Sequence, residues 1–477
     1  MARDDSTLQQ HPHALSTLQL SESDALEHPA AAPLAVSGRD GAHRRLAPQQ
    51  TAVLVGLLAV ALLLTAFGRD WGGGVISIIL LCGFTATSLL KLVSALTPLD
   101  PRPIRDLDDS DLPIYTVIAP LYREAEVVGE LVAALERLDY PHDRLQALIV
   151  LEEDDHETHQ AVRDLEPPAF IQVLTAPPGA PKTKPRACNL ALERARGEFL
   201  VIYDAEDAPH PGQLREAAAR FAADGPDLAC LQAPLRIESD PRFIPAQFAL
   251  EYAIQFEVVL PFLAKAGLPF PLGGTSNHFR TSSLRAVGGW DPYNVTEDAD
   301  IGFRLSAAGS RLDVIGLPTF EPAPTRFRDW LPQRARWVKG HMQTLAVHAR
   351  GPAVRTPASL TALILTLALS VASSHLHGLL AAWGLIGLLD LMTSDQTPAM
   401  RPLDLSLLLL GWASAAMAGL VGLRRAGSPI RLRDLVGTLI YWPLQSLAAA
   451  RASVQFVCDP YRWDKTPHAP RTGRAAS

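Results

Sequence analysis

Apolar residues are gathered into two blocks, one on each side of a central segment in which short apolar and polar stretches alternate. The first block holds the runs 51–67 and 74–90, and the second holds the runs 358–392, 405–423 and 436–457. A helix needs roughly 20 apolar residues to cross the hydrocarbon of a bilayer. The pattern therefore predicts two transmembrane helices at 51–97 and transmembrane or interfacial helices at 356–457, with the lipid bilayer as a partner.

Basic residues before the first block predict the side of the membrane on which the central segment 98–355 lies. Arg39, Arg44 and Arg45 precede the first apolar run, and positively charged flanks favour the cytoplasmic face. Two crossings return the chain to that same face. The sequence thus predicts an integral, multi-pass protein of the inner (plasma) membrane with segment 98–355 in the cytoplasm.

The basic segment 424–434 complicates the number of crossings in the second block. It also favours the cytoplasmic face, but a full hairpin at 358–392 would place it outside. Either 358–392 crosses once or 436–457 lies in the interface, and the pattern leaves both open. At the chain ends, residues 1–50 are polar and aperiodic, which predicts a disordered tail, and 458–477 is predicted to be a cytosolic tail.

Within the central segment, short apolar runs alternate with amphipathic stretches. Apolar runs bounded by turn-forming residues predict strands at 115–122, 145–153, 170–176 and 199–203, with helices at 124–138 and 186–196 between them. Strands that alternate with helices form a parallel sheet covered by helices. We therefore expect an α/β, Rossmann-like domain that binds its ligand at the carboxyl ends of the strands.

Carboxylates follow two of these strands. Asp154 and Asp155 come after the second, and Asp204, Glu206 and Asp207 come after the fourth. Hard oxygen ligands of this kind suit Mg²⁺ or Mn²⁺ bridged to phosphates, although a solvated acidic loop would have the same composition. The segment lacks the GxxxxGK[ST] motif, which disfavours a P-loop nucleotide triphosphatase.

Composition narrows the classes of function. The formal net charge of −7 argues against nucleic acid as a partner. The four cysteines show no paired spacing, so the sequence suggests neither a disulfide framework nor a zinc site.

Two further motifs lie nearer the second apolar block. Thr296-Glu297-Asp298 precedes a predicted helix, and taken alone it could be a helix cap with acidic residues in the first turn. Gln333, Arg336 and Trp337 lie in "WLPQRARWVKG". An arginine beside a tryptophan is also typical of the aromatic belt at a membrane interface.

The order of these motifs resembles that of the family 2 glycosyltransferases, specifically the membrane-embedded processive group that includes cellulose, hyaluronan and chitin synthases. The resemblance covers about 97–345 and rests on Asp204-x-Glu206, on Thr296-Glu297-Asp298 and on Gln333-x-x-Arg336-Trp337. It implies a cytosolic GT-A domain that transfers a sugar, with inversion, from a nucleotide-diphosphate sugar.

The resemblance also implies roles for residues of the donor site. Asp204 and Glu206 match the Asp-x-Asp motif that holds Mg²⁺ or Mn²⁺ on the donor diphosphate, with Glu206 in place of the second aspartate. Asp207 is a further candidate metal ligand. Either Asp154 or Asp155 would contact the nucleotide, because the loop lacks the usual Gly-Ser that would distinguish them.

Roles nearer the reacting atoms are implied in the same way. Lys184 and Arg336 match basic residues at the donor, and Asp298 matches the catalytic base. Trp337 matches the residue that stacks on the acceptor sugar, and Glu297 and Gln333 belong to the same acceptor-binding motifs.

The function implied is transfer from a nucleotide sugar, such as the UDP-sugar UDP-glucose, to a glycan acceptor that is a growing polysaccharide, coupled to export. The segments near 241–274 and 330–350 would then lie in the membrane interface, and export or regulatory proteins are possible partners. One alternative is a non-processive transferase that adds one sugar to a lipid carrier or glycolipid. The other is a transporter or scaffold with an inactive transferase domain.

Overall fold

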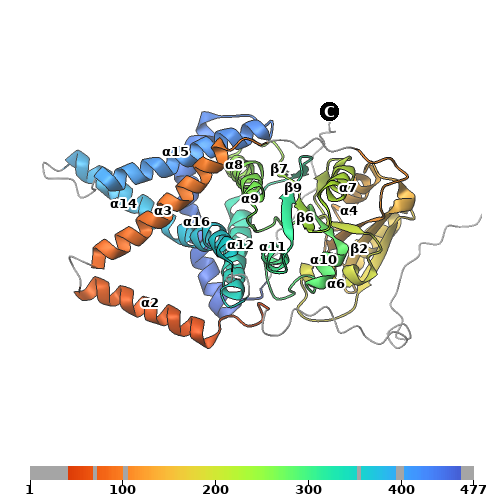
Figure 1. Cartoon of the computed structure of the whole chain (residues 1–477), viewed down its shortest axis with the longest axis horizontal. Coiled ribbons are helices and arrows are strands. Elements are labelled where there is room, and N and C mark those ends of the chain that lie inside the picture. The colour runs from red at the N-terminus through yellow and green to blue at the C-terminus, as the bar shows by residue number, and fades with distance from the viewer. Residues whose placement is uncertain (1–40, 68–71, 100–105, 352–355, 394–401, 463–477) are drawn as a thin grey trace, which may run out of the picture.

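The computed structural model describes residues 41–67, 72–99, 106–351, 356–393 and 402–462. Figure 1 shows a sheet domain at one end of the molecule and the long helices α2, α3, α14 and α15 at the other. Helices α8, α9, α12 and α16 lie between the two. Of the tails predicted at 1–50 and 458–477, residues 1–40 and 463–477 fall outside the described residues.

The domain is built on a seven-stranded sheet with the strand order β3-β2-β1-β4-β8-β6-β9. The strands are β1 Tyr115–Leu121, β2 Leu145–Glu152, β3 Ile171–Ala176, β4 Phe199–Ile202, β6 Leu228–Gln232, β8 Asn277–Arg280 and β9 Arg311–Val314. The first four are parallel, whereas β8 runs antiparallel to both β4 and β6. The α/β prediction is confirmed, and β1 to β4 form at the predicted positions.

A second sheet is small and lies beside the end of β4. It has three strands in the order β5-β10-β7. Their bounds are β5 Ala208–Pro209, β7 Leu235–Ile237 and β10 Thr319–Glu321. Because β5 follows directly after the acidic stretch at 204–207, this sheet fixes that stretch against a strand that is more than a hundred residues further along the chain.

Helices cover both faces of the large sheet, as strand alternation requires. In β1, Val117 and Ala119 pack into one core together with α4 and α7, whereas Ile118 packs into a second core with α6 and α9. The helices of the domain are α4 Val128–Glu136, η1 His142–Arg144, α5 His156–Asp164, α6 Lys184–Arg194, α7 Gln213–Asp224, α10 Thr281–Ala286 and α11 Glu297–Ala307. The two cores make the parallel strands a rigid base for the loops at their carboxyl ends.

The remaining helices are long or apolar. They are α2 Pro48–Phe67, α3 Gly72–Leu96, α8 Phe243–Ile254, η2 Gln255–Val259, α9 Leu260–Lys265, α12 Phe327–His348, α13 Pro357–Leu363, η4 Ile364–Ala368, α14 Leu369–Thr393, α15 Pro402–Arg425 and α16 Leu432–Cys458. Within the described residues, three helical stretches are long and apolar enough to cross a membrane: Phe243–Lys265, Pro357–Gly387 and Ser406–Arg425. These helices suggest a membrane protein.

The stretch Phe243–Lys265 differs from the amphipathic interfacial helices expected near 241–274. It is one continuous helical run through α8, η2 and α9. Phe256, Val259 and Leu260 pack into the sheet core, whereas Leu250 and Ala253 pack against Leu423 of α15. The run therefore joins the sheet domain to the apolar helices, because its apolar residues pack against the sheet core on one side and against α15 on the other.

Candidate active site

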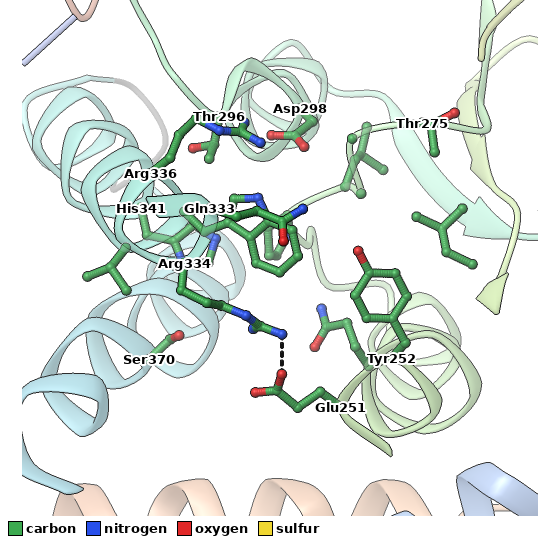
Figure 2. A pocket seen from close by; sticks show the side chains of 18 of the residues that line it. Glu251, Tyr252, Thr275, Thr296, Asp298, Gln333, Arg334, Arg336, His341 and Ser370 are labelled. Atoms are coloured by element: carbon green, nitrogen blue, oxygen red, sulfur yellow. Dashed lines mark hydrogen bonds and ion pairs between the residues drawn. The ribbon is translucent and has the colours of Figure 1, made fainter. Parts of the chain in front are cut away.

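A cavity of about 640 Å³ lies at the carboxyl ends of the parallel strands and continues between the long helices. Its walls include Tyr122 after β1, Glu152 at the end of β2 and Asp204 after β4. Figure 2 shows how α8, α11 and α12 direct side chains into it. The cavity thus lies where an open parallel sheet usually binds its ligand.

The acidic stretch after β4 divides into two parts. Asp204 and Glu206 line the cavity, whereas Asp207 is not among its lining residues and is only 2% exposed. One oxygen of Asp207, Oδ2, accepts a hydrogen bond from the Asp204 backbone N–H at 2.7 Å and another from the Thr275 hydroxyl. Burial, with the charges of Asp204 and Glu206, raises the pKa of Asp207 well above its usual value. Asp207 therefore holds the turn that presents the other two carboxylates.

Lys184, the first residue of α6, supplies a positive charge beside this turn. Its Nζ forms an ion pair with Asp204 and donates a hydrogen bond to the Gly274 carbonyl at 2.7 Å. Burial alone would lower the pKa of Lys184, but the carboxylates of Asp204 and Glu297 outweigh it and raise the pKa. The amine is therefore a permanent cation in the cavity wall.

The residues present fit a divalent cation bound together with a diphosphate. Among the described residues, no three His, Cys, Asp or Glu side chains form a group that could hold an ion alone. Mg²⁺ bound to phosphates typically uses only one or two protein carboxylates, and phosphate and water oxygens complete its shell. Asp204 and Glu206 offer two carboxylates in the cavity wall, which meets that requirement.

The carboxylates after β2 do not reach the cavity as expected. Asp154 is exposed and pairs with Lys182 at 2.8 Å. Asp155 is 4% exposed and caps α5, where its Oδ1 accepts the Thr158 backbone N–H at 3.3 Å. Glu152 lines the cavity instead. Its position as the last residue of β2 could have identified Glu152 as a cavity residue, because the last residue of a parallel strand lies at the edge of the sheet.

Glu297 and Asp298 begin α11 and both line the cavity. Thr296 occupies the cap position, but its side chain makes no capping hydrogen bond, so the motif is not the simple helix cap that its sequence also allowed. Burial raises the pKa of Asp298. Burial and the charge of Asp298 together raise the pKa of Glu297 to about 8. Two adjacent carboxyl groups with raised pKa values in a cavity are typical of a site of proton transfer.

Helix α12 brings the motif at 333–337 to the same cavity. Gln333, Arg336 and Trp337 all line it. Figure 2 shows Arg336 extending from α12 toward Asp298. The positive charges of Lys184 and Arg336 oppose the rise in the pKa of Glu297 and of Asp298 that burial causes. The Trp337 ring packs beside Tyr252 of α8, with centroids 6.3 Å apart. The three motifs singled out in the sequence are thus brought to one cavity.

One polar cluster in the wall was not found in the sequence. Glu251 of α8 pairs with Arg334 and accepts hydrogen bonds from the Tyr441 hydroxyl at 2.7 Å and from Gln445 Nε2 at 2.9 Å. The Arg334 guanidinium also lies 4.5 Å from the centre of the Trp337 ring. Each of these residues stands alone in a largely apolar sequence, so only the packing of three helices makes them a cluster.

Glu321 is a second residue that sequence reasoning missed. It lines the cavity, and one of its oxygens, Oε1, is buried without a hydrogen-bond partner among the described residues. Antiparallel pairing of β10 with β5 sets Phe320 opposite Ala208, so the next pair in register is Glu321 and Asp207. Burial and the charge of Asp207 raise the pKa of Glu321 well above its usual value.

The cavity also has a limb between the long helices. This membrane limb is lined by side chains of α3, η4, α14 and α16, and most of the polar ones carry hydroxyl or imidazole groups: Thr87, Ser88, Lys91, Thr366, Ser370, Ser373, Ser374, His377, Trp442 and Gln445. Hydroxyl groups and an aromatic ring in otherwise apolar helices are suited to a ligand that presents both hydroxyls and apolar C–H faces.

Residues 113–340 match the sequence model of a family described as "Glycosyltransferase like family 2". Among curated proteins, a beta-monoglucosyldiacylglycerol synthase of a Synechocystis species is 28% identical over 277 residues, which is 55% of this chain and 55% of that protein. Glucomannan 4-beta-mannosyltransferase 2 of Arabidopsis thaliana is 27% identical over 255 residues, or 50% of this chain and 47% of that protein. The chain spans about half the length of these curated relatives.

Among solved structures, a mannosyltransferase from Pyrobaculum calidifontis, in complex with GDP-Man and Mn²⁺, aligns with a TM-score of 0.52 at 20% sequence identity. The alignment covers 84% of this chain and 99% of that one. At this identity the likeness concerns the fold, and it confirms the predicted GT-A architecture of the sheet domain.

Proposed function

We propose that this chain, whose residues 113–340 match the family 2 glycosyltransferase model, moves a sugar from a nucleotide-diphosphate sugar to a growing polysaccharide that enters from the membrane side. The observation that supports this best is the continuity of the cavity. Asp204, Asp298 and Trp337 share one space with Ser374 and Trp442 of the long helices. A donor at the sheet edge and an acceptor between the helices would then meet at Asp298.

The charged residues of the cavity wall (Lys184, Asp204, Glu206 and Arg336, called the charged wall below) would bind the donor. Lys184 and Arg336 would neutralise the diphosphate, whose negative charge grows as the bond to the sugar breaks. Asp204 and Glu206 would hold Mg²⁺ or Mn²⁺, which supplies further neutralisation of that charge when bound. Tyr122 and Glu152 line the part of the cavity at the ends of β1 and β2 and would contact the nucleoside.

Asp298 would act as the general base. An acceptor hydroxyl is a poor nucleophile, and a carboxylate that accepts its proton typically contributes 10²–10⁴-fold to the rate. Burial raises the pKa of Asp298, which makes it a stronger base once it is ionised. Attack from the side opposite the leaving diphosphate inverts the configuration of the sugar carbon.

The acceptor would be a glycan because the membrane limb is polar. Ser370, Ser373 and Ser374 line this limb; the hydroxyls of Ser373 and Ser374 donate to the Ser370 carbonyl at 3.1 and 2.9 Å, and their oxygens can still accept hydrogen bonds from sugar hydroxyls. Trp442 and Trp337 offer rings suited to the apolar face of a pyranose. Such a lining would let a chain move onward after each addition. We propose on this basis, and on the basic residues that flank the apolar runs, a multi-pass inner-membrane protein with its transferase domain in the cytoplasm and the product exported between the helices.

Membranes containing the protein, incubated with a panel of UDP- and GDP-sugars, test this function. We expect one sugar nucleotide, with UDP-glucose tested first, to release nucleotide only with Mg²⁺ or Mn²⁺ and to yield a polymer. Absence of nucleotide release from every donor in the panel would contradict transferase activity and return the chain to the class of inactive scaffolds.

Transfer of a single sugar to a lipid is the second candidate. It is favoured by the Synechocystis relative, whose name gives a glucosyl lipid as its product, and by the position of the membrane limb between helices that lipid would surround. A single-sugar product extracted with lipid solvents, and no polymer, would support this candidate over the polysaccharide.

A further inference from the structure

The backbone immediately before Thr296 is held by a residue outside the cavity. The Val295 N–H donates a hydrogen bond to Gln343 Oε1 at 3.0 Å, and Asn294 Nδ2 donates to the Thr344 hydroxyl at 2.9 Å. Gln343 and Thr344 belong to α12, about two turns after Trp337. Neither lines the cavity. The helix that carries Arg336 and Trp337 is thereby tied to the loop that carries Asp298.

The same glutamine contacts the C-terminal segment 459–462. Gln343 is 3% exposed, and its Nε2 donates to the Pro460 carbonyl at 3.0 Å. One turn earlier, the buried Lys339 donates to the Arg462 carbonyl at 2.7 Å. Both ends of the Gln343 amide are therefore engaged by backbone groups, one from the loop before Asp298 and one from the end of the described chain.

The N-terminal segment 41–47 contacts both the loop before Asp298 and the C-terminal segment 459–462. The Ala42 N–H donates to Asp291 Oδ2 at 2.5 Å, and the Tyr461 hydroxyl donates to the His43 carbonyl. Arg45 Nη1 donates to the Val457 carbonyl at 2.7 Å. Segments 41–47 and 459–462, which sequence reasoning placed in polar tails, thus contact each other beside the loop 291–296.

The approach of α12 to this loop is also very close. A Cβ atom added at Gly340 would overlap the side chain of Thr296, so only glycine allows the helix backbone to pack there. Because Thr296 packs directly against the α12 backbone and follows Val295 in the chain, a shift of α12 or of Val295 moves the start of α11.

We propose that Gln343 is a positioning residue for Asp298, and that the paired chain ends, through Pro460, hold Gln343 in place. The proposal rests on the proposed function, in which Asp298 acts as the base. A small displacement of a reacting group can lower a rate by as much as about a hundredfold. Loss of the Gln343 contacts should therefore slow the chemical step while the donor, which binds to the sheet edge and Lys184, remains bound.

The chain offers a matched control in Gln146 of β2. It is also 3% exposed, its Oε1 accepts the Arg196 backbone N–H at 2.9 Å, and its Nε2 donates to the Arg194 carbonyl at 3.3 Å. Gln146 lies near the start of β2, six residues before the cavity-lining Glu152, or about 20 Å along an extended strand. Gln146→Leu therefore removes bonds of the same kinds far from the cavity, together with one that its Oε1 accepts from the Thr116 hydroxyl at 2.9 Å.

The test compares Gln343→Leu with Gln146→Leu in the full-length protein in nanodiscs. We expect kcat to fall about tenfold or more for Gln343→Leu, with the dissociation constant for the donor within about twofold of wild type, and no fall in kcat for Gln146→Leu. Deleting residues 459–477 should reproduce the loss. Equal kcat in the two leucine variants would overturn the proposal.

Two further measurements keep the outcomes distinct. Gln343→Glu keeps the acceptor for Val295 and is the variant to use if Gln343→Leu does not fold. Its kcat relative to wild type should recover as the pH falls, because the introduced carboxyl group, once protonated, can again donate to Pro460.

Amide hydrogen exchange at Val295 should be faster in Gln343→Leu than in Gln146→Leu even if the wild-type protein transfers no sugar, so failure of the proposed function and failure of this proposal are separable. Unchanged exchange at Val295 would count against it.

Discussion

The two ends of the cavity are built from different chemistry. At the sheet edge the wall carries opposite charges close together, with Lys184 paired to Asp204 and with Glu206 and Glu152 nearby. The membrane limb is lined mainly by hydroxyl, imidazole and aromatic groups, and the ion pair of Glu251 with Arg334 lies where the limb begins.

This difference matches two different tasks in the proposed reaction. A diphosphate must be held in one position while its charge increases, and fixed charges that need not reorganise do this best. A glycan that moves after each addition must not be held too firmly, and neutral hydrogen bonds, each worth only about 1 kcal/mol net, can be exchanged. The boundary between the two kinds of wall lies at Asp298 and Trp337.

The largest expected effect is at that boundary. Asp298→Asn keeps the size of the side chain but removes the proposed base, so kcat should fall by about 10²–10⁴-fold. Donor affinity should stay near that of wild type, since the charged wall is unchanged. Stopped assays of nucleotide release, with donor titration on the same preparation, measure both. A weaker donor affinity with normal turnover would make Asp298 part of the donor wall instead.

At the charged end, Asp204→Asn should abolish metal-dependent transfer and weaken binding of Mn²⁺ in the presence of the nucleotide. The substitution removes a cavity-lining carboxylate and the partner of Lys184. Asp227→Asn is a suitable control, because Asp227 is exposed and pairs with Arg311 at 2.5 Å. Electron paramagnetic resonance of free Mn²⁺ measures the binding directly, and full activity of the Asp204→Asn protein in the presence of a chelator would exclude the metal role.

The charged end is also the part of the molecule that could be predicted best from sequence. Strands β1 to β4 are contiguous apolar runs, and β4 is followed directly by acidic residues, so the position of Asp204 and Glu206 at the sheet edge could be predicted from the pattern. The errors arose where position depends on pairing between distant segments. Glu321 meets the acidic stretch only through the register of β10 with β5. Asp155, which caps a helix, could not be distinguished from Glu152 without knowing where β2 ends.

The membrane limb was much less predictable for the same reason. Ser374, Trp442 and Lys91 lie on three different helices, and an isolated polar residue in an apolar run does not indicate what it will face. The segment near 241–274 was expected in the interface because its polar residues and prolines are mixed with apolar ones. In the structure Glu251, one of those polar residues, faces the cavity rather than water.

The third prediction tests the membrane limb through Trp337. Trp337→Ala should shorten the polymer or stop its synthesis while donor hydrolysis persists, because in the proposed reaction the ring holds the acceptor and not the donor. Trp383→Ala is the control: that tryptophan is 38% exposed on α14 and would anchor the protein in the interface without touching the cavity.

Product length at matched protein level decides between these roles for Trp337. Polymer of unchanged length from Trp337→Ala would end the processive interpretation. A loss of membrane insertion shared by both variants would instead assign Trp337 to the aromatic belt.

The smallest expected effect concerns Glu297, which lines the cavity next to the proposed base Asp298. Its pKa is raised to about 8 by burial and by the charge of Asp298, so at neutral pH it is largely protonated and can donate a hydrogen bond to an acceptor hydroxyl. As the pH rises through 8, that donor is lost, and the apparent acceptor KM of the wild-type enzyme should rise by about fivefold, the equivalent of roughly one neutral hydrogen bond.

Glu297→Gln keeps an N–H donor at every pH, so its acceptor KM should stay flat across this range. Glu193→Gln, a substitution at an exposed position of α6, should retain the wild-type profile. A step near pH 8 that persists in Glu297→Gln would assign the titration to another group and remove Glu297 from the acceptor site.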